Sequence, residues 1–121
     1  MEDKEILYAK GKISLNHYKW KDAQVNIIKI YDEKKDYNNL LSEANLFLEY
    51  FPESTRVPLA LFYSGSGYFY LSNYGKAIEA FKKIIKDYPE SEYCSTATHN
   101  INQCYKRLGS TERIGVEEQT E

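Results

Sequence analysis

EYFPES at residues 49–54 returns 37 positions later as KDYPES at residues 86–91. Each phrase closes a longer segment, YNNLLSEANLFLEYFP at 37–52 and YGKAIEAFKKIIKDYP at 74–89. In both segments the apolar residues are separated by three, one, three, three, one and three positions: Tyr37, Leu40, Leu41, Ala44, Phe47, Leu48 and Phe51, then Tyr74, Ala77, Ile78, Phe81, Ile84, Ile85 and Tyr88. This spacing fits one face of an α-helix and not the alternation of a strand. The two segments therefore predict the same helix twice.

The segments that precede these helices repeat at the same interval. Alanine and tyrosine recur three times, at Ala23, Ala60 and Ala97 and at Tyr31, Tyr68 and Tyr105. Pro52 and Pro89 are placed to end the second helix of each pair. Ser54 and Ser91 are placed to N-cap the helix that follows, and Pro58 suits the first turn of its helix.

The pattern predicts six helices joined by short connections, so that neighbours run antiparallel. They cover about 4–17, 20–35, 38–51, 55–71, 74–87 and 92–108. Paired helices with a period in the thirties are typical of solenoids. We therefore expect an all-α, right-handed α-solenoid of two and a half to three repeats over 1–109. The polar tail at 110–121 has no apolar stripe, and we expect it to be flexible.

Three short motifs resemble the tetratricopeptide repeat: Leu61-x-x-Ser64-Gly65-x-x-Tyr68, then Ala77-x-x-x-Phe81, then Pro89. Leu61 and Ser64 stand where that repeat usually has Trp and Leu. The resemblance implies that Gly65 permits a close approach of two helices; it does not account for Gly67. The residues expected to pack the repeats are Ala60, Gly65, Tyr68, Tyr74, Ala77, Phe81, Pro89, Ala97 and Tyr105.

The stretch LSNYGKAIEAFKKIIKDYPESEYCSTATHNINQCYKRLG at 71–109 resembles repeats of the BamD (YfiO) family of outer-membrane assembly lipoproteins, and secondarily of YbgF-like periplasmic repeat proteins. The resemblance implies a non-catalytic scaffold at the periplasmic face of the outer membrane. Its partners would be a β-barrel assembly component or the terminal segment of an unfolded outer-membrane client. Membrane contact would come only from a lipid anchor, and we expect none within this chain. The alternatives are a periplasmic coordinator, a cytoplasmic co-chaperone, and a structural protein that self-associates through its terminal helices.

Composition and motifs argue against other classes of function. The 121 residues carry a net charge of −2 and no basic block, so no nucleic-acid partner is expected. No apolar run reaches the roughly 18–20 residues that span a bilayer. The sequence contains no glycine-rich phosphate loop, CxxC, HExxH or GxSxG motif. We therefore expect neither an enzyme nor a cofactor.

The spacing of the cysteines argues against a disulfide bond and against a metal site. Cys94 and Cys104 lie ten residues apart, about 15 Å along a helix, whereas a disulfide needs Cα atoms within roughly 7 Å. His99 lies five residues from each cysteine, a rotation of about 500° along a helix, so it does not share a face closely with either thiol. Two free thiols are expected.

The helix predicted at 55–71 is apolar on more than one side. Its second stripe consists of Leu59, Phe62, Tyr63, Ser66, Phe69 and Tyr70. Shifted by one repeat, these positions are acidic-leaning towards the N-terminus (Asp22, Val25, Asn26, Lys29, Asp32 and Glu33) and basic towards the C-terminus (Thr96, His99, Asn100, Gln103, Lys106 and Arg107). One interpretation is a peptide-binding groove formed by Phe62, Tyr63, Ser66, Phe69, Tyr70, His99, Gln103 and Arg107. The other is a central helix that its neighbours cover on both sides.

Overall fold

A computed structural model describes residues 17–109 of the chain, with side chains from residue 23 onward. This part contains five helices and no strand, which confirms the all-α prediction. The helices are α2 (His17–Glu33), α3 (Tyr37–Tyr50), α4 (Val57–Tyr70), α5 (Tyr74–Asp87) and α6 (Cys94–Leu108). The helix predicted at 4–17 and the tail at 110–121 lie outside the described residues, apart from His17, which begins α2.

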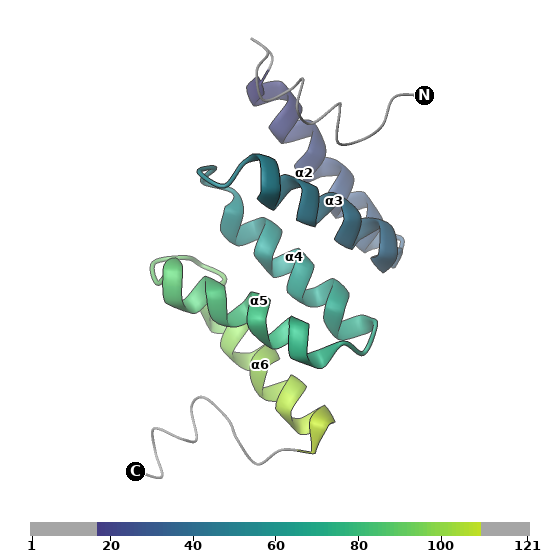
Figure 1. Cartoon of the computed structure of the whole chain (residues 1–121), viewed down its shortest axis with the longest axis vertical. Coiled ribbons are helices and arrows are strands. Elements are labelled where there is room, and N and C mark those ends of the chain that lie inside the picture. The colour runs from purple at the N-terminus through teal and green to yellow at the C-terminus, as the bar shows by residue number, and fades with distance from the viewer. Residues whose placement is uncertain (1–16, 110–121) are drawn as a thin grey trace.

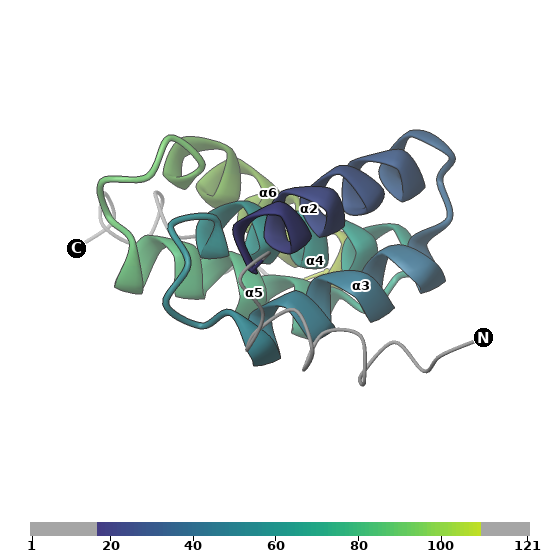
Figure 2. The ribbon, with the colours of Figure 1, turned by 90° about the horizontal axis from the view of Figure 1, so that it is seen from above.

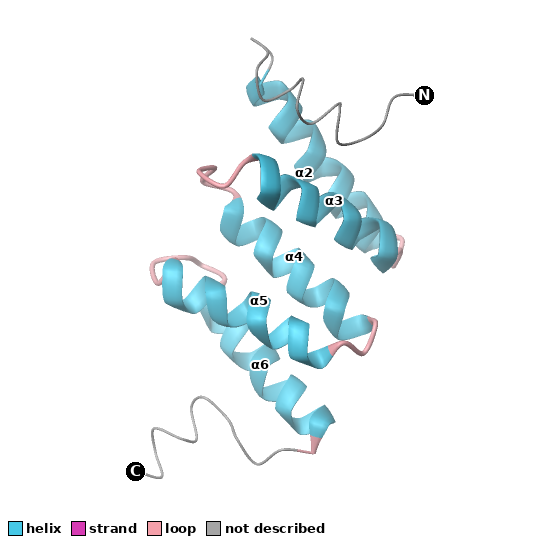
Figure 3. Cartoon of the chain, viewed as in Figure 1, coloured by secondary structure: helices cyan, strands magenta, loops and turns pink. Residues whose placement is uncertain are grey.

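Each helix packs against the next one along the chain, and α2 also touches α4 (Figure 1). The connections between helices are short (Figure 3). Seen from above, α3 and α5 lie together on one side, α2 and α6 lie on the other, and α4 lies between them (Figure 2). Helix α4 is thus the central element, and it packs against α3 and α5.

The turns that enter α3 and α5 have the same construction 37 residues apart. The Asp36 carboxylate accepts from the backbone N–H of Asn39 at 3.4 Å, and the Asn73 side chain accepts from the N–H of Lys76 at 3.3 Å. The residues just before these caps, Lys35 and Ser72, have φ of 58° and 63°. Non-glycine residues rarely adopt positive φ. The sequence repeat therefore extends to matching, uncommon backbone conformations.

The turns that enter α4 and α6 also match, but the predicted serine caps are wrong. The N-cap residues are Arg56 and Tyr93, neither of which makes a side-chain cap. Ser54 and Ser91 lie two residues earlier, and each hydroxyl accepts from the backbone N–H of that N-cap residue at 3.1 Å. The serines thus close the turn before the helix instead of capping the helix itself.

Two clusters of buried side chains form the core. The first joins α2, α3 and the start of α4: Val25, Ile28, Leu40, Ala44, Phe47, Phe51 and Ala60. The second joins α4, α5 and α6: Val57, Leu61, Ala77, Ile78, Phe81, Ile84, Ala97, Ile101 and Cys104. Ala60 and Ala97 therefore pack on the helices that precede them. Ala23 occupies the same repeat position but is exposed.

Two glycines of α4 mark close contacts with different neighbours. A Cβ added to Gly65 would lie 2.7 Å from two ring carbons of Phe81 in α5, as the close approach expected there requires. A Cβ added to Gly67 would lie 3.0 Å from two side-chain carbons of Leu41 in α3. The structure thus supplies the reason for Gly67 that the sequence lacks.

Gly67→Ala is expected to change the free energy of unfolding by less than about 1 kcal/mol. Alanine improves helix propensity by about 1 kcal/mol over glycine, which is expected to offset the cost of moving the Leu41 side chain and the Cδ2 atom of Leu40, 3.1 Å away, by a few tenths of an ångström. Urea denaturation measures the change. A loss of more than about 2 kcal/mol would mean that the α3–α4 contact cannot relax.

Within residues 17–109, no helix combines the length and the apolar character that crossing a membrane requires.

Candidate functional site

The second stripe of α4 lies at the surface, next to the core. Leu59, Phe62, Tyr63, Ser66 and Phe69 are half-buried, and Tyr70 is 60% exposed. The buried residues of α4 are a different set: Val57, Ala60, Leu61, Ser64, Gly65 and Gly67. The neighbouring helices therefore leave part of every stripe residue accessible, although α4 is central.

Contacts between rings hold the stripe in place. Phe62 stacks on Tyr93 with ring centroids 5.0 Å apart, and Phe69 meets Tyr70 edge-on at 5.3 Å. Tyr70 in turn stacks on Tyr37 of α3 at 4.9 Å. Rings that are already held by neighbours lose little conformational freedom when a partner covers them. The stripe is therefore a pre-arranged aromatic surface.

Opposite charges lie near the two sides of this aromatic surface. Burial raises the pKa of the Tyr63 phenol, and the charges of Asp32, Tyr93 and Glu33 raise it further. Burial also raises the pKa of Asp32, with Glu33 adding to the effect. The acidic end of α2 therefore lies close to the middle of the stripe.

The basic side comes from the end of α6. The guanidinium carbon of Arg107 lies 5.5 Å from the ring centroid of Phe69, a cation–π contact. His99 and Arg107 are exposed and Gln103 is half-buried. Among the three, Arg107 is the residue with a ring contact to the stripe in the described part of the chain.

Two aromatic residues that the repeat spacing does not assign to the groove also belong to the surface. Tyr93, at the start of α6, stacks on Phe62, and Tyr37, at the start of α3, stacks on Tyr70. Tyr37 is the first residue of α3 and Tyr93 is the N-cap residue of α6. The spacing of apolar residues within one helix does not show which neighbouring helix these end residues contact. Val25, assigned by repeat spacing to the acidic side, is instead fully buried in the first core cluster.

The residues expected to pack the repeats have different environments. Ala60, Gly65, Ala77, Phe81 and Ala97 are buried, whereas Tyr68, Tyr74 and Tyr105 are half-buried and Pro89 is exposed. The Tyr68 hydroxyl accepts from the amide of Asn45 at 3.3 Å, and the Ser64 hydroxyl donates to the same amide at 3.4 Å. This small polar network gives a structural role to Ser64, which stands where the tetratricopeptide repeat usually has leucine.

The thiols are free, as predicted. Cys94 is half-buried and its Sγ lies 3.1 Å from the carbonyl oxygen of Tyr88, while Cys104 is fully buried. No cluster of three or more His, Cys, Asp or Glu residues in the described part of the chain is arranged to hold a metal ion.

Comparison with protein families gives a match that covers nearly the whole chain. The family described as "YfiO: Outer membrane lipoprotein" matches residues 4–116 of the 121. The matched range includes all five helices and every residue of the α4 surface. No curated protein matches the chain.

Proposed function

Since the chain belongs to the YfiO family of outer membrane lipoproteins, we propose that it is a non-catalytic scaffold in the assembly of β-barrel proteins in that membrane. The family membership confirms the resemblance of residues 71–109. The observation that carries the proposal is the accessible row of aromatic side chains on α4, which suits the capture of a polypeptide. The scaffold would act at the periplasmic face of the membrane.

The architecture that we propose is a tetratricopeptide-like, right-handed α-solenoid over residues 1–109, followed by a tail at 110–121. The support is the 37-residue recurrence of helix starts, caps and positive-φ residues between α3 and α5. In such a solenoid the first helices of each pair line one face, so α2, α4 and α6 would form a common binding surface.

The proposed groove consists of Phe62, Tyr63, Ser66, Phe69, Tyr70, His99, Gln103 and Arg107. Its rings would serve as anchors for apolar side chains of an extended or helical segment. Acidic residues of α2 and basic residues of α6 would favour a segment with opposite charges at its two sides. The segment would come from a β-barrel assembly component or from an unfolded outer-membrane client.

Photo-cross-linking tests this proposal. A photoreactive residue at Tyr70, in the groove, is compared with one at Glu49, an exposed position on α3. On irradiation in native envelopes, Tyr70 is expected to yield adducts with assembly components or outer-membrane clients, identified by mass spectrometry. Arg107→Glu is expected to weaken these adducts at least several-fold, since it reverses the charge beside Phe69.

Lys86→Glu provides the matched control, because Lys86 is exposed on α5 and the charge change is identical. Far-UV circular dichroism checks that each variant is folded. Equal adducts at Tyr70 and Glu49, or equal effects of the two charge reversals, would contradict the groove.

Self-association is a second candidate, favoured by apolar side chains exposed on the two outermost described helices. Ile30 of α2 is 47% exposed and Leu108 of α6 is 54% exposed. Sedimentation velocity over a hundredfold concentration range decides between monomer and oligomer. A monomer at every concentration would exclude this candidate and leave the groove unaffected.

A further inference from the structure

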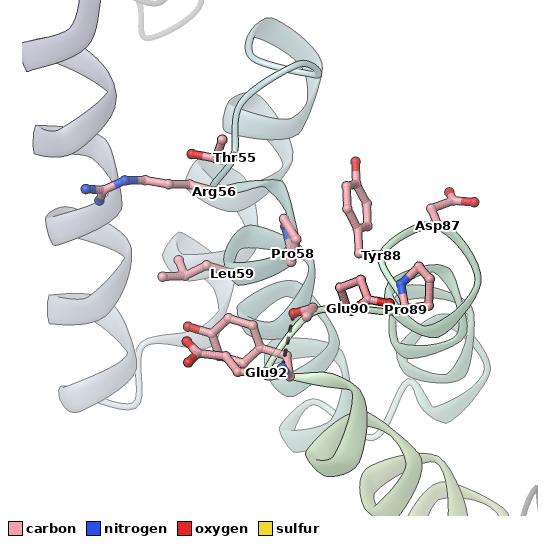
Figure 4. Close-up of a pocket in the computed structure, with 11 residues that line it drawn as sticks. Thr55, Arg56, Pro58, Leu59, Asp87, Tyr88, Pro89, Glu90 and Glu92 are labelled. Carbon is pink, nitrogen blue, oxygen red and sulfur yellow. Dashed lines mark hydrogen bonds between the residues drawn. The ribbon is translucent and has the colours of Figure 1, made fainter.

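A cleft of about 580 Å³ lies between the entry to α4 and the turn from α5 to α6 (Figure 4). It falls within the range of about 300–1,000 Å³ that is usual for ligand sites. One wall comes from the entry to α4 and the other from the turn between α5 and α6. The residues that line it are Thr55, Arg56, Pro58, Leu59, Asp87, Tyr88, Pro89, Glu90, Ser91, Glu92 and Tyr93.

Four of the eleven residues that line the cleft carry rings, two prolines and two tyrosines. Pro58 of α4 lies opposite Tyr88 and Pro89, which follow α5 (Figure 4). The ring of Tyr93 is fixed by its stack on Phe62 at 5.0 Å. Flat rings on a fixed backbone favour a guest that also has flat, rigid side chains, because neither side loses much conformational entropy.

The lining residues carry an excess of negative charge. Three carboxylates, Asp87, Glu90 and Glu92, oppose one basic residue, Arg56, which leaves a formal charge of −2. The guanidinium of Arg56 points away from the opposite wall (Figure 4). Asp87 is paired with Lys83 at 3.4 Å, while Glu90 and Glu92 are exposed at the rim. The cleft therefore complements a cationic guest.

We propose that this cleft binds an extended, proline-containing polypeptide segment that carries a lysine or an arginine. Proline rings of the segment would pack against the tyrosines and prolines of the walls, and its cation would lie beside Glu90 and Glu92. The walls are helix ends and turns, with no strand edge to which a β-strand could add. A polyproline II segment needs no such edge, since its backbone makes no internal hydrogen bonds and docks on aromatic-lined grooves.

Fluorescence anisotropy on the full chain tests the proposal with two labelled peptides, Pro-Pro-Lys-Pro-Pro and the same peptide with Glu in place of Lys. The lysine peptide is expected to bind at least tenfold more tightly at low salt, and to weaken as salt is added. Glu90→Lys combined with Glu92→Lys is expected to raise its Kd at least tenfold. Glu49→Lys combined with Glu79→Lys, at two exposed sites outside the cleft, makes the same net charge change and is expected to leave Kd within twofold.

Tyr88→Ala probes the apolar wall and is also expected to raise Kd at least tenfold. Tyr88 packs against the core, so circular dichroism is needed to check that this variant folds. If it does not fold, the variant with Glu90→Lys and Glu92→Lys decides the test, because both of its changes are at the surface. Amide chemical shifts are expected to change at 55–59 and 87–93. Equal binding of the two peptides, absence of binding, or shift changes centred on Tyr70 would overturn the proposal. These outcomes are independent of the cross-linking result at Tyr70, so the proposal of the cleft and the proposal of the groove can be contradicted independently.

Discussion

Phe81→Ala is expected to lower the free energy of unfolding by about 3–5 kcal/mol, as measured by urea denaturation. Phe81 is fully buried in the second core cluster, between α4, α5 and α6. Truncation removes the buried ring and leaves a cavity that the backbone of α4 cannot fill, because Gly65 has no side chain to contribute. This loss is a large part of the net stability of a typical domain, which is about 5–15 kcal/mol.

The same contact predicts a strong coupling between Phe81 and Gly65. Gly65→Ala alone is expected to destabilise by about 1–3 kcal/mol, because the new Cβ would overlap the Phe81 ring at 2.7 Å. In the Phe81→Ala background the same change is expected to be neutral or stabilising, since the Cβ then enters the cavity and helix propensity improves by about 1 kcal/mol. Additive effects in this double-mutant cycle would show that the two residues do not meet.

A second large effect is expected in alkaline solution. Burial raises the pKa of the Cys104 thiol from its ordinary value of 9.0 to about 11. The folded state therefore holds this proton more tightly than the unfolded chain does. The resulting stabilisation is complete below the thiol pKa of the unfolded chain and is lost as pH rises from about 9 towards 11. Two pKa units correspond to about 2–3 kcal/mol.

Urea denaturation at pH 7, 9 and 10.5 measures this loss. Cys104→Ala is expected to flatten the decline, although it lowers stability at pH 7 because it removes a buried side chain. Cys94→Ala is the matched control and is expected to retain the decline. Burial raises the pKa of the tyrosines Tyr37, Tyr63 and Tyr93 as well, so some loss with the same sign will remain in every variant. Parallel curves for the wild type and Cys104→Ala would contradict the prediction.

The helices themselves could be predicted from the sequence. The predicted range 74–87 coincides with α5, and the four other helices differ from their predicted ranges by three residues or fewer at each end. The physical reason is that the spacing of an apolar stripe and a residue such as Asp36 or Asn73 at the cap act over a few neighbouring positions. The family could be recognised from the same local phrases.

The candidate site depended on more distant contacts. Repeat spacing could not show that Tyr93 stacks on Phe62, since the two belong to different repeats and meet only when α6 lies beside α4. It also could not separate Val25, which is buried, from Asp32 on the same helix. The charge asymmetry of α2 and α6 was visible in the sequence, but its proximity to the aromatic stripe was not.

The sequence by itself determined the helices, their 37-residue recurrence and the absence of catalytic motifs, because each of these resides in local spacing. Only the tertiary structure decided which equivalent positions are covered. Ala60 and Ala97 are fully buried, while Ala23 at the equivalent position is exposed. Gly67 is buried, while Ile30, which precedes it by one 37-residue repeat, is half exposed. Burial depends on which helices pack beside a residue, and an identical residue in an identical repeat position has a different environment when the neighbouring helix differs.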